Sequence, residues 1–234
     1  MGIAFLDMEL IQPENGYRFS VDAFLLAAFA KQFNPKHFCD MGAGCGVVSW
    51  QLHQLLPSAT GVAVEIQPVF KEFGRTNLAG TGISFLCRDI RDLPRQDRKF
   101  DLLISNPPYF KVGHGKLSKN PVKAQARHRL NGSVSDWCSS MNKHLKEDGG
   151  VCIIYPSRYA AELVTDMLKV GFNLRVLLQI ASFEGEEPKL DCLYFSAEPG
   201  EVRTQCLNLY REHRKRSAAA KKFLSGTLQE GIFL

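Results

Sequence analysis

The chain has 234 residues, of which 45% are hydrophobic and 23% charged, and its formal net charge is +5. This length and composition favour a single soluble globular domain. The longest apolar stretch, residues 23–30, is too short for a membrane span, and no signal peptide is recognised. Seven cysteines without C-x-x-C spacing favour reduced thiols that pack in a core. We therefore expect a cytoplasmic protein with no membrane partner and no bound metal.

The first regular element expected along the chain is an apolar helix over residues 21–31, with Ser20 as N-cap and Asp22 in its first turn. Residues 1–33 are interpreted as an N-terminal extension. Short apolar runs of strand length then alternate with helical patterns, which predicts a mostly parallel sheet covered on both faces. The strands are expected at 37–41, 61–66, 83–87, 100–105, 151–155, 174–181 and 190–196, and the later helices at 47–56, 68–79, 135–146 and 158–170.

The turn-like segment 183–188 separates the last two predicted strands and is too short to hold a crossover helix. The seventh strand should therefore run antiparallel to the other six. These elements predict a Rossmann-like α/β domain over residues 1–198, followed by a basic C-terminal tail over 199–234. The sequence does not fix the oligomeric state, and a monomer is expected.

A glycine motif, Asp40-Met-Gly-Ala-Gly-Cys-Gly46, follows the first predicted strand. Dinucleotide-binding turns have the pattern G-x-G-x-x-G/A, which would require glycine or alanine where Val47 stands. S-adenosylmethionine has no phosphate, so its site needs only a bare backbone turn beneath the methionine and ribose. The motif therefore predicts an S-adenosylmethionine site, and a tight strand-to-helix connection without ligand is the alternative. The residues expected to line the site are Asp40, Gly42, Gly44 and Gly46.

Two acidic residues follow the next strands at positions that suit a nucleoside. Glu65 ends the second predicted strand, where its carboxylate can accept hydrogen bonds from both ribose hydroxyls. Asp89 lies just beyond the third strand and can accept from the adenine amine of the methyl donor. Either acid alone would more often be an exposed turn residue or an ion-pair member.

The tetrapeptide Asn106-Pro107-Pro108-Tyr109 follows the fourth predicted strand. The amino nitrogen of adenine is conjugated with its ring and attacks poorly. The Asn106 side-chain oxygen and the Pro107 carbonyl can accept hydrogen bonds from both of its N–H groups. These bonds raise the electron density on the nitrogen and orient it. Consecutive prolines preorganise these acceptors, and Tyr109 offers a stacking face for a planar base. The motif predicts direct methyl transfer to a planar amine without a strong general base.

Basic residues are concentrated in two parts of the chain. The second cluster, residues 211–222, contains a single acid, Glu212. Such clusters suggest a phosphate-bearing partner, although a solvated loop and an exposed tail helix are alternatives. The first cluster lies in residues 106–132, interpreted as a substrate loop, and its candidate nucleic-acid-binding residues are Lys111, Lys116, Lys119, Lys123, Arg127 and Arg129.

Together, the glycine motif, Asn-Pro-Pro-Tyr-Phe110 and the segment 12–27, with its Gln-Pro-x-x-Gly-Tyr-Arg-Phe-Ser start, resemble the bacterial tRNA adenine-N6 methyltransferases that act next to the anticodon of a valine tRNA. The resemblance covers about residues 5–197. It implies the class I methyltransferase fold, with Phe19 and Asp22 near the methionine end of S-adenosylmethionine. It also implies that Asn106 and Tyr109 lie at the target base, in an anticodon loop that is already unpaired.

Two other functions are compatible with these motifs. Asn-Pro-Pro-Tyr also occurs in enzymes that methylate other RNA or DNA bases or a glutamine in a protein. A non-catalytic adaptor could keep the fold and bind RNA without turnover. The segment 12–19 and the basic substrate loop favour tRNA over both.

Overall fold

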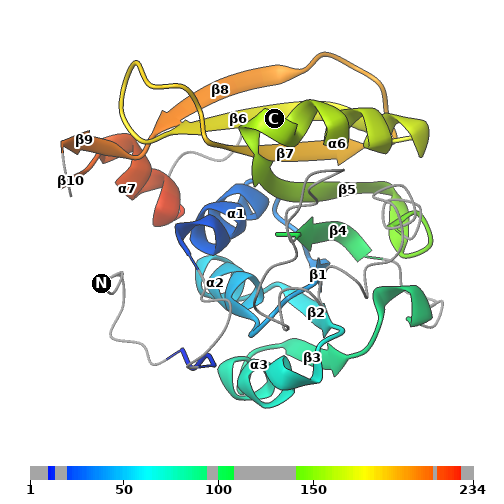
Figure 1. Cartoon of the computed structure of the whole chain (residues 1–234). Coiled ribbons are helices and arrows are strands. Elements are labelled where there is room, and N and C mark those ends of the chain that lie inside the picture. The colour runs from blue at the N-terminus through cyan, green and yellow to red at the C-terminus, as the bar shows by residue number, and fades with distance from the viewer. Residues whose placement is uncertain (1–9, 14–19, 94–99, 108–140, 213–214, 228–234) are drawn as a thin grey trace, which may run out of the picture.

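The computed structural model describes residues 10–13, 20–93, 100–107, 141–212 and 215–227, in which helices cover both faces of a central sheet (Figure 1). The sheet contains β1 (His37–Met41), β2 (Thr60–Glu65), β3 (Ile83–Cys87), β4 (Phe100–Ser105), β5 (Leu145–Pro156), β6 (Asn173–Ala181), β7 (Leu190–Ser196) and β8 (Arg203–Asn208). The helices are α1 (Val21–Lys31), α2 (Val47–Leu55), α3 (Lys71–Asn77), α6 (Ser157–Lys169) and α7 (Ala218–Leu224), with short 3-10 turns η1 (Pro68–Phe70) and η2 (Ile90–Asp92). A separate hairpin is formed by β9 (Tyr210–Glu212) and β10 (Lys215–Arg216).

The strands are arranged in the order β3-β2-β1-β4-β5-β7-β6-β8. β1 to β5 pair in parallel, whereas β7 runs antiparallel to both β5 and β6, which confirms the antiparallel seventh strand. The chain moves outward from β1 to β3 and then returns to place β4 on the other side of β1. Ligands bind such sheets in the crevice at the carboxyl ends of the strands where the order reverses, here between β1 and β4.

Within the described residues the sheet has eight strands, so the predicted number of seven is wrong by one. The additional strand, β8, pairs in parallel with β6 at the edge of the sheet. Its sequence, RTQCLN, has no apolar alternation, and only one of its six residues is buried. The sequence therefore contains no signal for this strand. The helix expected at 135–146 also needs correction at its end: residues 145–156 form β5, and residues 135–140 lie outside the described part of the chain.

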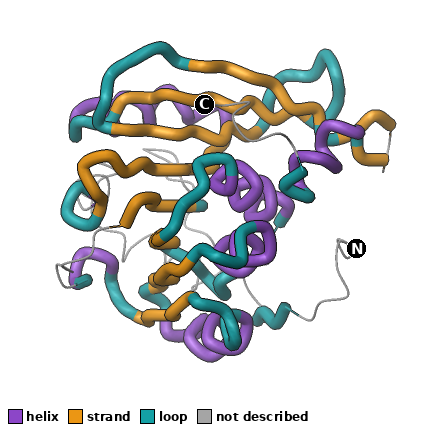
Figure 2. Tube along the Cα trace, turned by 180° about the vertical axis from the view of Figure 1, so that it is seen from behind, coloured by secondary structure: helices purple, strands orange, loops and turns teal. Residues whose placement is uncertain are grey.

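Successive side chains of the central strands enter two apolar clusters. Phe38 and Leu102 pack into one cluster with α1, α2 and α7, whereas Cys39 and Leu103 pack into the other with α6. Figure 2 shows these helices on the two sides of the sheet. The central strands are therefore buried on both faces, as their nearly continuous apolar sequences predict.

Candidate active site

The glycine turn after β1 is held by β2 and leaves open space above it. The backbone N–H groups of Gly42 and Ala43 donate to the Val64 carbonyl at 2.9 and 3.0 Å. Gly42 and Gly44 have φ of +77° and +55°, and a Cβ added to either would meet no atom within 4 Å. At Gly46, with φ of +81°, a Cβ would lie 3.1 Å from Leu78. Gly42 and Gly44 can therefore pass beneath a ligand, whereas Gly46 packs against the end of α3.

Glu65, at the end of β2, fixes the conformation of this turn. Its two carboxylate oxygens accept hydrogen bonds from the backbone N–H groups of Gly44 at 2.9 Å and Gln67 at 2.8 Å. The side chain is buried, and this burial raises the pKa of Glu65 while the hydrogen bonds oppose the rise. The Gln67 side chain and the Ile66 backbone also donate to this carboxylate.

Asp40 lies beneath the turn, bonded to α2. It is 1% exposed, and its Oδ2 accepts a hydrogen bond of 2.7 Å from the Ser49 hydroxyl. Burial raises the pKa of Asp40 to about 7, although the hydrogen bonds from Ser49 oppose the rise. In this position Asp40 connects β1 to the first turn of α2 and supports the glycine turn from below.

Asn106 and Pro107 follow β4 directly beside the glycine turn. In the β1–β4 register Asp40 is opposite Ile104, so the residues after each strand, including Gly42 and Asn106, emerge side by side. The buried Ser105 hydroxyl donates to the Met41 carbonyl at 2.7 Å and holds the two strand ends together. Asn106 is half-buried and Pro107 is buried. The structure thus brings together the two motifs that the sequence separates by about sixty residues.

The remaining predicted acids occupy different places along the same sheet edge. Asp89 follows β3, and Arg91 donates to it from its backbone N–H at 2.9 Å and from its Nε at 3.0 Å. These bonds lower the pKa of Asp89. Asp22 lies in the first turn of α1, near β7. The pKa of the Cys192 thiol in β7 is raised mainly by burial, and the charges of Asp191 and Asp22 add to the rise.

Sequence reasoning missed Asn77, which joins the N-terminal segment to the glycine turn. Its Oδ1 accepts from the Ile11 N–H at 2.9 Å, and its Nδ2 donates to the carbonyls of Ile11 and Cys45, both at 2.8 Å. Asn77 ends α3 and is buried. Its burial and its partners are set by the fold, so no signal in the sequence identifies it.

Several predicted site residues lie outside the described part of the chain: Phe19, Tyr109, Lys111, Lys116, Lys119, Lys123, Arg127 and Arg129. Within the described ranges, no cluster of three or more His, Cys, Asp or Glu side chains is arranged to hold a metal ion. Across those same ranges, no helix has the length and apolarity needed to cross a bilayer.

Comparisons with known proteins agree with this geometry. A family model described as a methyltransferase domain matches residues 33–196. A protein of Glaesserella parasuis is 28% identical over 87% of both chains, and one of Citrobacter koseri is 26% identical over 86% of this chain and 83% of its own. Both are named tRNA1(Val) (adenine(37)-N6)-methyltransferase.

Solved structures share the fold. A predicted O-methyltransferase from Agrobacterium tumefaciens aligns with a TM-score of 0.65 and 18% identity, over 88% of this chain and 96% of its own. A methyltransferase from Pyrococcus furiosus aligns with a TM-score of 0.58 and 13% identity, over 84% and 92%. The fold is thus the Rossmann-like methyltransferase fold that the sequence predicts, extended by β8.

Proposed function

Because the chain belongs to the methyltransferase domain family, we propose that it transfers a methyl group from S-adenosylmethionine to N6 of an adenine next to the anticodon of a tRNA. One observation carries the proposal. The glycine turn and Asn106 emerge side by side from β1 and β4, fastened by the bond from Ser105 to Met41. A donor on the turn and an amine held by Asn106 would therefore meet in one crevice, where orientation alone can supply much of the rate.

The described residues fit S-adenosylmethionine, which when bound supplies an activated methyl group. A Cβ added to Gly42 or Gly44 would meet no atom within 4 Å, so the backbone of the turn is open to the adenosyl and methionine parts. The buried carboxylate of Glu65 ends β2 beside the glycine turn and is the acceptor proposed for the ribose hydroxyls, and Asp89 is the acceptor proposed for the adenine amine. Asp22, and Phe19 outside the described residues, are proposed at the methionine end.

The chain's own part in the reaction is to orient the target nitrogen and make it a better nucleophile. The Asn106 side-chain oxygen and the Pro107 carbonyl accept hydrogen bonds from the two N–H groups of the target amine, and Tyr109 stacks on the base. The backbone that carries both acceptors is held in place, because Pro107 is buried and Ser105 anchors the end of β4. The alkylated nitrogen is acidic and releases its proton to water, so no side chain is needed as a strong base.

The names of the relatives and the basic substrate loop support tRNA as the substrate. Phosphate contacts from the loop lysines and arginines would hold the RNA while the unpaired adenine enters the crevice. Because tRNA is the substrate, we also propose that the protein works in the cytoplasm.

The test is transfer of a radiolabelled methyl group to total tRNA that lacks its own modifications, followed by nucleoside analysis. The expected product is N6-methyladenosine. Label in a protein glutamine instead would assign the site to a protein substrate. If the wild-type chain labels neither RNA nor protein extracts, it acts as an adaptor and the proposal is wrong.

A further inference from the structure

Five basic residues near the end of the described chain form what we call the C-terminal basic surface. Four of the side chains are exposed and that of Arg216 is half-buried. Glu212 is the single acid in residues 209–227, and its carboxylate accepts from Arg211 at 3.2 Å and from Lys215 at 3.0 Å. A positive excess therefore remains on this surface. Its residues are Arg211, Lys215 and Arg216 of the β9–β10 hairpin and Lys221 and Lys222 of α7.

The C-terminal basic surface lies on the same edge of the sheet as the active site. β8 is parallel to β6, and both β6 and β5 are antiparallel to β7, so β8 points in the direction of β4. The hairpin follows the carboxyl end of β8, as Asn106 follows that of β4. Four strand spacings separate β4 from β8, or roughly 19 Å at about 4.8 Å per strand.

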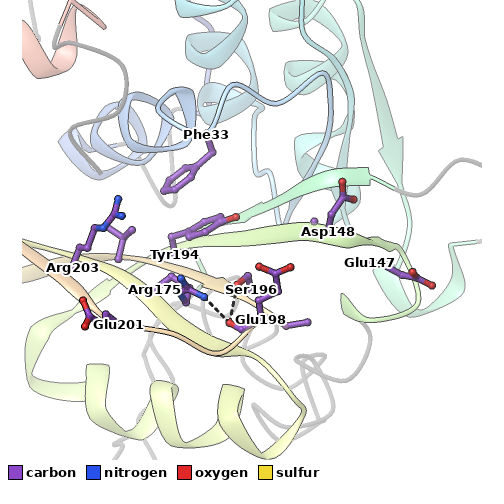
Figure 3. Close-up of a pocket in the computed structure, with 12 residues that line it drawn as sticks. Phe33, Glu147, Asp148, Arg175, Tyr194, Ser196, Glu198, Glu201 and Arg203 are labelled. Atoms are coloured by element: carbon purple, nitrogen blue, oxygen red, sulfur yellow. Dashed lines mark hydrogen bonds between the residues drawn. The ribbon is translucent and has the colours of Figure 1, made fainter. Parts of the chain in front are cut away.

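A pocket at the opposite edge of the sheet has an excess of acidic residues. It has a volume of about 300 Å³ and opens beside the stacked rings of Phe33 and Tyr194, whose centroids are 3.8 Å apart (Figure 3). Two arginines also line it, and one of them, Arg175, donates to the carbonyls of Glu198 and Pro199. Its acidic lining residues are Glu147, Asp148, Glu198 and Glu201. This distribution of charge directs a polyanion toward the catalytic edge and away from the pocket.

The surface is held on a well-anchored element. The Ser217 hydroxyl caps α7 by accepting from the Ala220 N–H at 2.9 Å, and it donates to the Asn208 carbonyl at the end of β8 at 2.7 Å. Phe223 and Leu224 are buried beneath the helix. Lys221 and Lys222 therefore project from a fixed backbone, which reduces the ordering cost of binding.

We propose that the C-terminal basic surface binds duplex phosphates of the same RNA whose unpaired adenine occupies the crevice at Asn106. This inference rests on the proposed function and adds a second contact site to it. One folded RNA can span the two sites, because a loop base and the phosphates of the adjoining stem lie within a comparable distance. Phosphate contacts of this kind position the RNA and carry no sequence information.

The test compares Lys221→Gln/Lys222→Gln with wild type in direct binding, by fluorescence anisotropy at several salt concentrations. The probes are an unmodified transcript of tRNA1(Val), its anticodon stem-loop, and the loop nucleotides alone. For the two stem-containing probes, affinity should fall about tenfold. The negative slope of log affinity against log salt should become shallower by about 1.4 to 1.8. Affinity for the loop nucleotides should be unchanged, because they lack the stem.

The matched control is Lys146→Gln/Lys169→Gln, which removes two exposed charges from weak surface ion pairs outside the C-terminal basic surface. It should bind all three RNAs like wild type. Should the α7 variant not fold, Arg211→Gln/Lys215→Gln tests the hairpin half of the surface. Unchanged affinity and salt slope for the stem-loop would overturn the inference. The inference would also be overturned if the Lys221→Gln/Lys222→Gln variant lost binding to phosphatidylserine vesicles but bound RNA like wild type. That result would assign the surface to a membrane.

These measurements do not depend on catalysis. If the wild type forms N6-methyladenosine but the lysine variant binds RNA normally, the surface assignment fails and the function stands. If no methyl transfer to RNA occurs yet the variant loses stem binding, the function fails and the surface assignment stands.

Discussion

The hydroxyl of Ser105 donates a 2.7 Å hydrogen bond to the carbonyl of Met41 and thereby joins the last residue of β4 to the last residue of β1. Both proposed halves of the active site begin one residue later, at Gly42 and Asn106. The distance between donor and acceptor sites is thus set by buried backbone rather than by the loops themselves. Catalytic groups placed in this way need little reorganisation when substrates bind.

Ser105→Ala should lower kcat as well as the free energy of unfolding, and the loss of kcat should exceed what reduced stability alone would cause. Removal of the hydroxyl leaves the Met41 carbonyl without this partner and should lower the free energy of unfolding by about 1–3 kcal/mol. Misplacement of Asn106 should also reduce kcat by roughly tenfold or more. Urea unfolding and steady-state kinetics measure the two effects. The exposed Ser84→Ala on β3 is the control, and equal kcat values for both variants would contradict the positioning role.

Gly42→Ala tests whether the glycine turn binds a ligand. Gly80 provides a matched control, since both glycines have φ of +77° and a Cβ at either meets no atom within 4 Å. Each alanine should cost about 1–2 kcal/mol of stability through its left-handed backbone. Only Gly42→Ala should weaken S-adenosylmethionine binding in calorimetry, by tenfold or more, because its methyl group fills the proposed cradle. Equal affinities for the two variants would place the cofactor elsewhere.

Asn106→Ala should separate catalysis from cofactor binding. The variant loses the acceptor proposed to orient the amine, so kcat should fall by about 100- to 1,000-fold, as when a preorganised hydrogen-bonding group is removed from a reaction centre. The affinity for S-adenosylmethionine should change by less than a factor of three. Asn142→Ala, which removes an exposed amide bonded to the Val170 carbonyl, should retain full activity. Substantial turnover by Asn106→Ala would remove that residue from the mechanism.

Asp40 should make the chain less stable as the pH rises from 5 to 8. Its pKa is near 3.9 in the unfolded chain, and burial raises it to about 7 in the fold. The folded state therefore holds this proton more tightly. The resulting stabilisation is complete below pH 4 and disappears as the pH rises through 7.

Asp40→Asn removes this titration and keeps an oxygen for the Ser49 hydroxyl. The fall in unfolding free energy between pH 5 and pH 8 should be smaller than in wild type by about 2–3 kcal/mol. Urea unfolding at the two pH values measures it, with the exposed Glu162→Gln as control. An Asp40→Asn variant with the pH dependence of wild type would show that Asp40 titrates normally in the fold.

Apolar periodicity was sufficient to predict the central strands and their direction. β1, β3, β4 and β7 begin and end where the sequence predicts, because buried strands leave continuous apolar runs bounded by glycine or polar turns. β8 could not be predicted in the same way. It lies at the edge of the sheet, five of its six side chains escape burial, and its position depends on backbone pairing with β6.

The site shows the same division between chemistry and support. The places of Gly42, Glu65 and Asn106 at the ends of strands could be predicted from the sequence, and their roles toward one cofactor and one amine stay predictions. The contacts of Asn77 and Ser105 could not be predicted, because each residue bonds to a backbone carbonyl that only the folded chain brings near, across 32 residues for Cys45 and 64 for Met41. Supporting contacts of this kind have no local sequence signature.

The packing of α7 on α1 affects the order in which a newly made chain can mature. Ala220, Phe223 and Leu224 are buried, α7 lies against α1, and the Lys31 ammonium donates to the Gly226 carbonyl at 3.0 Å. A ribosome produces α1 well before α7, because α7 lies far later in the chain. Until α7 has been made, the part of α1 that it covers faces solvent. The nascent polypeptide should therefore be a better chaperone client and protease substrate before α7 emerges than after it.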